Sequence, residues 1–223
     1  MNIIEQLISL VAVHRCVSCA VEGAIICDSC VHSSLRPVPS RCYRCHAVTR
    51  QSQTCRSCKS STQISHVWIA AEYQDIAKKA LHKLKFNRAK ASAKTIAEII
   101  DSSLPDLPDD LMVCHIPTAN KRVRMRGYDQ AQLIAKHLSK IRRWERQTLL
   151  ARTGKSRQVG AGRRERFKHL EQALRIRNNL ELSGKHVLLI DDVTTTGATI
   201  EAAAKLLKNA GVKTVDVAVF AQP

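Results

Sequence analysis

Short apolar runs without regular polar alternation recur along the chain, and they alternate with segments whose apolar residues are spaced as on one face of a helix. Such runs lie at 111–116 and 187–190, and further strands are predicted at 67–73, 147–151 and 212–220. The segments with helical spacing lie at 75–84, 121–138 and 199–209, with a further one ending near 103. Such runs are typical of parallel strands covered on both faces, and the spaced segments are typical of the covering helices. The pattern predicts an α/β fold with a parallel sheet and flanking helices.

The segment from Val187 to Ile200 joins four apolar residues, two acids and a loop rich in threonine. Asp191 and Asp192 would leave the carboxyl end of the strand, where open α/β sheets bind ligands. The loop then enters a helix, whose free N–H groups and positive dipole end favour a phosphate. Its residues are Thr194, Thr195, Thr196, Gly197, Ala198 and Thr199. A buried strand with a threonine-capped helix is the plainer interpretation, but adjacent acids favour a ligand with vicinal hydroxyls or a metal beside its phosphate.

Four Cys-x-x-Cys pairs of identical spacing precede this region. Their residues are Cys16, Cys19, Cys27, Cys30, Cys42, Cys45, Cys55 and Cys58. One pair can direct two thiolates at a tetrahedral ion, so two pairs complete a structural zinc site. Pairing in order would give one site from the first four thiols and one from the last four, and an interleaved arrangement stays open. We expect about two zinc ions per chain, and few apolar residues between the pairs suggest that zinc holds this segment together.

A polar stretch at 60–65 separates the cysteine-rich part from the rest. We expect an N-terminal module at 1–60, with a helix at 2–13 and a double zinc ribbon, and a larger domain at 61–223. The helix carries no Lys or Arg, which favours packing on the protein over lying on a membrane. No stretch approaches a membrane span, and no secretion signal is evident. Free thiols in such a chain indicate a reduced, cytoplasmic protein.

Positive charge is concentrated in one part of the chain. The formal net charge is +17, and two four-cysteine zinc sites would leave about +13. Residues 121–177 hold eighteen Lys or Arg against four acids. A polyanionic partner or a very anionic substrate follows as a hypothesis.

The turn after the 111–116 strand begins with Pro117 and Thr118, where a diphosphate loop would lie in this class of fold. The cations that follow directly are Lys121, Arg122, Arg124 and Arg126. Their position favours anion contact over a solvated helix face. A Gly-, Lys- and Arg-rich stretch at 152–162 leads to Arg163 and Arg166. It would suit a lid over a diphosphate leaving group, and an ordinary surface loop is the alternative.

Read from Asp191 to Thr199, the order acidic-Asp-apolar-x-Thr-Thr-Gly-x-Thr resembles the 5-phosphoribosyl 1-diphosphate (PRPP) signature of type I phosphoribosyltransferases. This resemblance implies that the two acids face the ribose 2- and 3-hydroxyls. It also implies that Thr195 to Thr199 wrap the 5-phosphate of PRPP, which is bound with Mg.

The whole chain resembles the ComF family of competence-associated, phosphoribosyltransferase-like proteins. The resemblance rests on the cysteine pairs, Lys83-Leu-Lys-Phe86, Lys121-Arg-x-Arg-x-Arg-Gly-Tyr-Asp-Gln130, Gln158-x-Gly-x-x-Arg-x-Glu-Arg166 and the PRPP signature. It implies handling of incoming single-stranded DNA in natural transformation, with a competence helicase or other DNA-uptake proteins as partners. One departure is Cys114-His-Ile-Pro-Thr-Ala-Asn120, where relatives commonly read Val-Pro-Val-Pro-Leu-His-Pro. The alternative function is active transfer of ribosyl 5-phosphate from PRPP to a nitrogen acceptor.

Overall fold

Five parallel strands form the central sheet of the computed structural model, which describes residues 14–86, 90, 92–153, 173–177 and 181–223. Their order is β1 (Val67–Glu72), β7 (Thr214–Gln222), β6 (His186–Val193), β2 (Met112–His115) and β3 (Glu145–Arg146). The predicted parallel sheet is therefore confirmed. The helix predicted at 2–13 lies outside the described residues.

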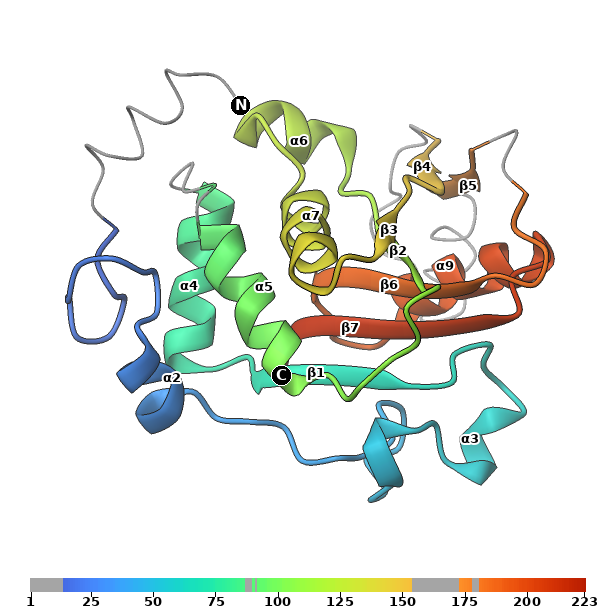
Figure 1. Ribbon diagram of the computed structural model, residues 1–223, viewed down its shortest axis with the longest axis horizontal. Helices are drawn as coiled ribbons and strands as arrows, with labels where there is room; N and C mark the ends of the chain where they lie inside the picture. Colours follow the sequence, from blue (N-terminus) through green and yellow to red (C-terminus); the bar gives the residue numbers. More distant parts are fainter. Residues whose placement is uncertain (1–13, 87–89, 91, 154–172, 178–180) are drawn as a thin grey trace, which may run out of the picture.

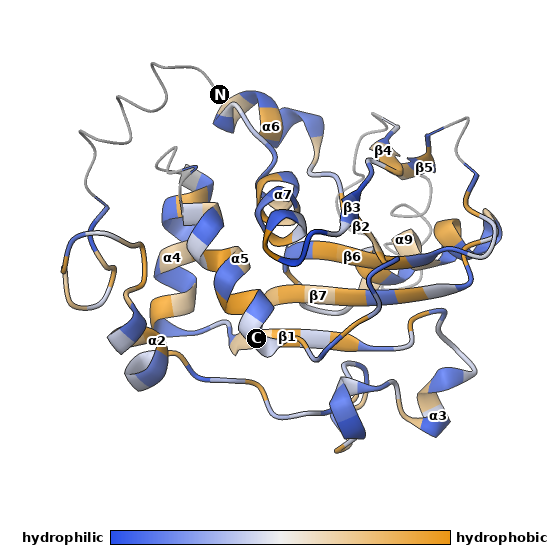
Figure 2. Cartoon of the chain, viewed as in Figure 1, coloured by the Kyte–Doolittle hydropathy of each residue, from blue (hydrophilic) through white to orange (hydrophobic). Residues whose placement is uncertain are grey.

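Both faces of the sheet are covered, which explains why the central strand β6 contains the unbroken apolar run from Val187 to Ile190. Leu188 and Ile190 face a core formed with α4 (Asp75–Phe86), α5 (Ser92–Ser103) and α7 (Gln130–Arg142). Val187 and Leu189 face the opposite core, formed with α9 (Ala198–Asn209). Figure 1 shows the three helices on one side of the sheet and α9 on the other, and Figure 2 shows the apolar character of β6 and β7. Burying one such aliphatic side chain contributes about 1.5–3 kcal/mol.

Three predicted elements differ in detail. Strand β6 continues through the acids instead of stopping before them, because Asp191 and Val193 stay in register with β7. The helix predicted at 121–138 is two helices, α6 (Asn120–Arg126) and α7, because Gly127 adopts a left-handed conformation with φ of 81° between them. The strand predicted at 147–151 is replaced by β3 in the central sheet and by β4 (Leu150–Arg152), which pairs antiparallel with β5 (Leu174–Ile176).

The chain leaves strands β2 and β6 toward opposite faces of the sheet. From β2 it runs through α6 and α7 to β3, and from β6 it runs through α9 to β7. Because β2 and β6 are neighbours, the loops that follow them diverge at the carboxyl edge of the sheet. This is the place at which open α/β sheets form a ligand crevice.

The cysteine-rich segment packs on both cores of the sheet. It contains α2 (Asp28–Ser34), the 3₁₀ turn η1 (Arg50–Ser52) and α3 (Arg56–Lys59). Ile25 and Ile26 join the core with α4 and α5, whereas Tyr43 joins the core with α9. Between them the chain follows the edge strand β1, where Glu72 N donates to Arg36 O at 2.9 Å. The expectation that zinc alone holds this segment was therefore wrong, because these buried side chains anchor it to the sheet.

In the described part of the chain, no helix has the length and apolar character needed to cross a bilayer.

Candidate ligand site and cysteine clusters

Two acids at the end of β6 meet a lysine from α4. Asp192 is buried and its Oδ2 forms an ion pair with Lys85 Nζ. Asp191 is half-buried, and its Oδ1 accepts a hydrogen bond from Asp192 N at 2.8 Å. Lys85 is placed here because Tyr128, between α6 and α7, donates its hydroxyl hydrogen bond to Leu84 O at the end of α4. The pairing of Lys85 with Asp192 was missed by the sequence analysis, which named this lysine only within the motif Lys83-Leu-Lys-Phe86.

The two carboxyl groups compete for one ammonium group. Burial, and then the neighbouring charge of Asp192, raise the pKa of Asp191 well above its ordinary value, while Lys85 lowers it less. A ligand hydroxyl or a cation that interacts with Asp191 would favour its ionised form. The acid pair is thus suited to a ligand that presents donors or a metal at this edge.

Opposite effects on stability are expected from Asp191→Asn and Lys85→Met. Since folding raises the pKa of Asp191, this group favours folding at low pH, and its contribution is lost as the pH rises through the raised value. Asp191→Asn should therefore raise the melting temperature at pH 8 by about 2–4 °C for each kcal/mol gained, with the gain vanishing toward about pH 4.

Lys85→Met leaves both acids without their cationic partner, so this variant should lower the melting temperature by about 5 °C. Thermal unfolding across pH checks both, and a loss of stability in Asp191→Asn at pH 8 would contradict this account.

The loop between β6 and α9 offers free backbone donors. Thr194 is buried, and its N donates to Ala221 O at 3.1 Å, which fixes the start of the loop. Thr195 and Thr196 are exposed, and Gly197 has a φ of 76°, a region that favours glycine. Within the described residues, the N–H groups of Thr195, Thr196 and Gly197 donate to no acceptor. These groups lie at the N-terminal end of α9, where Ala198 and Thr199 begin the helix, so the arrangement suits a phosphate.

Pro117 and Thr118 follow β2 in a loop that is held from two sides. Asp129 accepts from Thr118 N at 2.7 Å and from Thr118 Oγ1 at 3.1 Å. Arg152 Nε, from β4, donates to Pro117 O at 2.9 Å. Burial lowers the pKa of Arg152, and the charge of Asp191 opposes that shift, so the guanidinium lies within electrostatic reach of the acid pair. The sequence analysis missed Asp129 and Arg152, for which the only local signals were a basic stretch and a helix start.

His115 at the end of β2 is a further residue that the sequence analysis passed over. His115 is 3% exposed, and the Nδ1 atom of its ring has no hydrogen-bond partner among the described residues. Burial lowers the pKa of this imidazole, which keeps it neutral near pH 7. The neighbouring Cys114 is fully buried, and burial raises its pKa to about 12, so it has no thiolate character.

The predicted cations follow the Pro117 loop on α6, which buries none of its residues. Lys121, Arg122 and Arg124 are exposed. Arg126 is half-buried and donates from Nη1 to Gln130 Oε1 at 2.8 Å. Figure 2 shows α6 as mostly hydrophilic at the rim of the molecule. Arg163 and Arg166 lie outside the described residues.

The cysteines form two compact groups. One contains Cys16, Cys19, Cys27 and Cys30, and the other contains Cys42, Cys45, Cys55 and Cys58. Within each group the sulfur atoms all lie within 4.8 Å of one another. The Sγ atoms are 3.5 Å apart in the pairs Cys19–Cys27 and Cys45–Cys55. A tetrahedral zinc ion with Zn–S bonds of about 2.3 Å separates its ligands by about 3.8 Å, so both groups fit zinc.

Close contacts within the second group shift the pKa values of its thiols in opposite directions. A hydrogen bond from the Ser57 hydroxyl, with Oγ 3.1 Å from the sulfur, lowers the pKa of Cys55 to about 6. The adjacent Cys55 raises the pKa of Cys58 to about 12. Thiolates held this close repel one another, and a divalent cation removes that repulsion.

Comparisons with known proteins agree with this architecture. A family model described as the phosphoribosyl transferase domain matches residues 123–223, which include the acid pair and the threonine loop. The DNA utilization protein YhgH of Escherichia coli O6:H1 is 28% identical over 157 residues, or 66% of this chain and 67% of that protein. The competence protein ComFC of Bacillus subtilis is 28% identical over 202 residues, or 83% and 79% of the two chains. ComFC of Streptococcus pneumoniae is 28% identical over 198 residues, or 87% and 86%. With its parallel α/β sheet and paired cysteine groups, the chain is similar to the competence protein ComFC over most of its length, and its C-terminal part matches the phosphoribosyl transferase domain.

Proposed function

We propose that this protein binds Mg-PRPP in the crevice between the loops after β6 and β2, and handles single-stranded DNA during DNA uptake. The observation that carries the first half is the meeting of an acid pair with a loop of unpaired N–H donors. The two features lie next to each other at the sheet's topological switch point. A phosphorylated sugar fits both features, because its phosphate can accept from the N–H groups and its hydroxyls can donate to the acids.

In this proposal each part of PRPP has a place. The 5-phosphate lies on the loop from Thr195 to Thr199, at the N-terminal end of α9. The ribose hydroxyls donate to Asp191 and Asp192, which favours their ionised forms. The diphosphate and its Mg lie toward the Pro117 loop, where Arg152 supplies positive charge.

The DNA half of the proposal rests on charge and on the relatives. YhgH is named for DNA utilization and ComFC for competence. Helix α6 follows the Pro117 loop and exposes Lys121, Arg122 and Arg124, and Met125 among them is 66% exposed. Cations on an exposed helix track a phosphate backbone without reading its bases, so little sequence preference is expected.

Phosphoribosyl transfer to a nitrogen acceptor is the second candidate. It is favoured by the acid pair, since carboxylates beside the ribose would stabilise positive charge that develops at C1. In that case Mg-PRPP incubated with the protein and an amine would release diphosphate faster than without the protein. Binding without release would leave a PRPP-responsive DNA-binding protein.

Calorimetric titration with Mg-PRPP, repeated in the presence of a short single strand, tests the proposal. We expect saturable binding of about one PRPP per chain. We also expect that the strand leaves the PRPP affinity nearly unchanged, because the exposed cations of α6 follow the Pro117 loop and are not part of the loop after β6. Competition between the two would instead place the strand in the crevice, and absence of PRPP binding would remove the proposed ligand.

A further inference from the structure

We propose that the second cysteine group positions the phosphate loop through Tyr43, so that metal loading of this group sets the affinity of the loop for a phosphate ligand. This inference rests on the proposed function, since it concerns the loop that would hold the PRPP 5-phosphate. It assigns Tyr43 as a positioning residue, although this tyrosine lies outside the crevice itself.

The ring of Tyr43 packs directly beneath the loop. Tyr43 lies in the turn between Cys42 and Cys45, and it is 4% exposed. A Cβ atom added at Gly197 would lie 3.1 Å from Tyr43 Cε2 and 3.4 Å from Cδ2. The ring therefore fills the space next to the left-handed glycine that turns the chain into α9, and it limits where that turn can move.

The hydroxyl of Tyr43 is bound to the first turn of α9. It donates to Glu201 Oε1 at 2.5 Å, and Thr62 Oγ1 donates to Glu201 Oε2 at 2.8 Å. Arg44 Nη1 donates to Glu201 Oε1 at 3.2 Å and to Ser61 O at 2.6 Å. All three groups that bind Glu201 come from the segment that carries the second cysteine group. One carboxylate thus ties this segment to the helix whose N-terminus faces the ligand.

Electrostatics give a second reason for the coupling. A carboxylate in the first turn of α9 lowers the affinity for a phosphate at the same helix end, because two negative charges repel each other strongly where little water lies between them. In the folded protein the Glu201 side chain is 14% exposed and is balanced by Arg44. If the second group loses its metal and its turn loosens, Glu201 loses these partners and Gly197 loses its support. Both changes lower the affinity for an anion.

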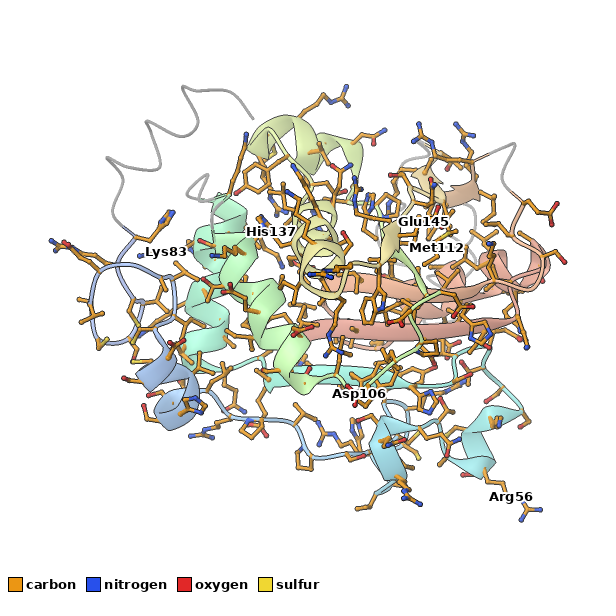
Figure 3. The ribbon with its side chains drawn as sticks, viewed as in Figure 1. Arg56, Lys83, Asp106, Met112, His137 and Glu145 are labelled. Carbon is orange, nitrogen blue, oxygen red and sulfur yellow. The ribbon has the colours of Figure 1, made fainter. Side chains whose placement is uncertain are left out.

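The first cysteine group supplies an internal control. It has the same Cys-x-x-Cys spacing, but Val17 and Ser18 occupy the positions of Tyr43 and Arg44. It packs on the opposite core, beside α4, and Lys83 Nζ donates to Arg15 O at 3.3 Å. Lys83 is labelled in Figure 3, on the side of α4 that faces this segment. Among the described residues, the first group makes no hydrogen bond with the phosphate loop.

A matched pair of variants separates the two groups. Cys45→Ser and Cys19→Ser each remove an exposed thiol from the corresponding position of one group. Each should lower the zinc content by about one ion per chain. We expect Cys45→Ser to weaken Mg-PRPP binding about tenfold and to speed amide hydrogen exchange at residues 194–201. Cys19→Ser should change the affinity less than about twofold and leave that exchange unaltered.

Variants of Tyr43 test the coupling without touching a ligand of the metal. Tyr43→Phe keeps the ring and loses the bond to Glu201, so we expect about threefold weaker binding, whereas Tyr43→Ala should lose about tenfold. Both should retain two zinc ions. If Cys45→Ser fails to fold, these variants still test whether Tyr43 couples the second cysteine group to the phosphate loop.

Equal effects of Cys45→Ser and Cys19→Ser, or wild-type affinity in Tyr43→Ala, would overturn the inference. Failure of the wild type to bind Mg-PRPP would instead contradict the proposed function. The hydrogen-exchange comparison of residues 194–201 then decides the inference alone, because it needs no ligand. Faster exchange in Cys45→Ser but not in Cys19→Ser supports the coupling, and equal exchange contradicts it.

Discussion

Removal of zinc is expected to lower the melting temperature of the whole protein by about 10 °C or more, instead of releasing a separate N-terminal module. The reason is the placement of the two cysteine groups on opposite cores of one sheet. Ile25 and Ile26 are 2% and 1% exposed against the α4 side, and Tyr43 is 4% exposed against the α9 side. When the metal leaves, the turns that hold these side chains loosen and both cores are opened to water.

Melting followed by circular dichroism, with and without a chelator, measures this effect, and metal analysis should give about two zinc ions per chain beforehand. A fragment of residues 61–223 provides the comparison. We expect it to unfold with low cooperativity or to aggregate, since it lacks the side chains that complete both cores. A fragment that melts like the whole chain, or a chelated protein with an unchanged main transition, would show that the segment is independent of the sheet.

Single-stranded DNA binding is expected to weaken about a hundredfold between about 50 and 200 mM salt. This follows if about five phosphates are engaged, because each contributes a slope of about −0.7 in the logarithm of affinity against the logarithm of salt. Replacing Arg122, Arg124 and Arg126 with Ala should flatten the slope by about two units. Fluorescence anisotropy of a labelled strand across a salt series measures both quantities.

The control for this experiment removes the same charge elsewhere. Arg56, Lys78 and Lys79 are exposed cations on α3 and α4, and Figure 3 shows Arg56 pointing away from the body of the molecule. Their replacement by Ala should leave the slope nearly as in the wild type. An equal loss in both triple variants would indicate that net charge alone attracts DNA, and absence of binding at low salt would contradict the DNA half of the proposal.

Local sequence was enough to predict the central part of the site but not its surroundings. The apolar run, the acids and the threonine loop lie within 187–200, so one segment carries the strand, the turn and the helix start. Lys85 reaches Asp192 and Tyr43 reaches Glu201 only through the packing of distant elements, which no local pattern reveals. The same limit explains Arg152, because β4 leaves the central sheet to pair with β5.

Two differences in the secondary structure have physical causes that the sequence analysis weighed wrongly. The acids were expected to end β6, but ladder pairing with β7 continues as far as Val193, so tertiary pairing outweighed their low strand propensity. The apolar spacing from 121 to 138 continues past Gly127, which hid the break between α6 and α7. The signal for the break was present in Gly127 and in Asp129, which caps α7 by accepting from Gln132 N at 3.3 Å.

The most direct test of the proposed ligand site is a calorimetric titration of Mg-PRPP into the wild type and into the double variant Asp191→Asn with Asp192→Asn. The amide side chains keep the size of the acids but cannot accept the ribose hydroxyls as carboxylates do. Several weakened contacts of about 1–3 kcal/mol each should reduce the affinity by more than about tenfold. Unchanged zinc content and a single cooperative melting transition would show that the fold is intact. Equal affinity in the two proteins would contradict the assignment of this loop as the PRPP site.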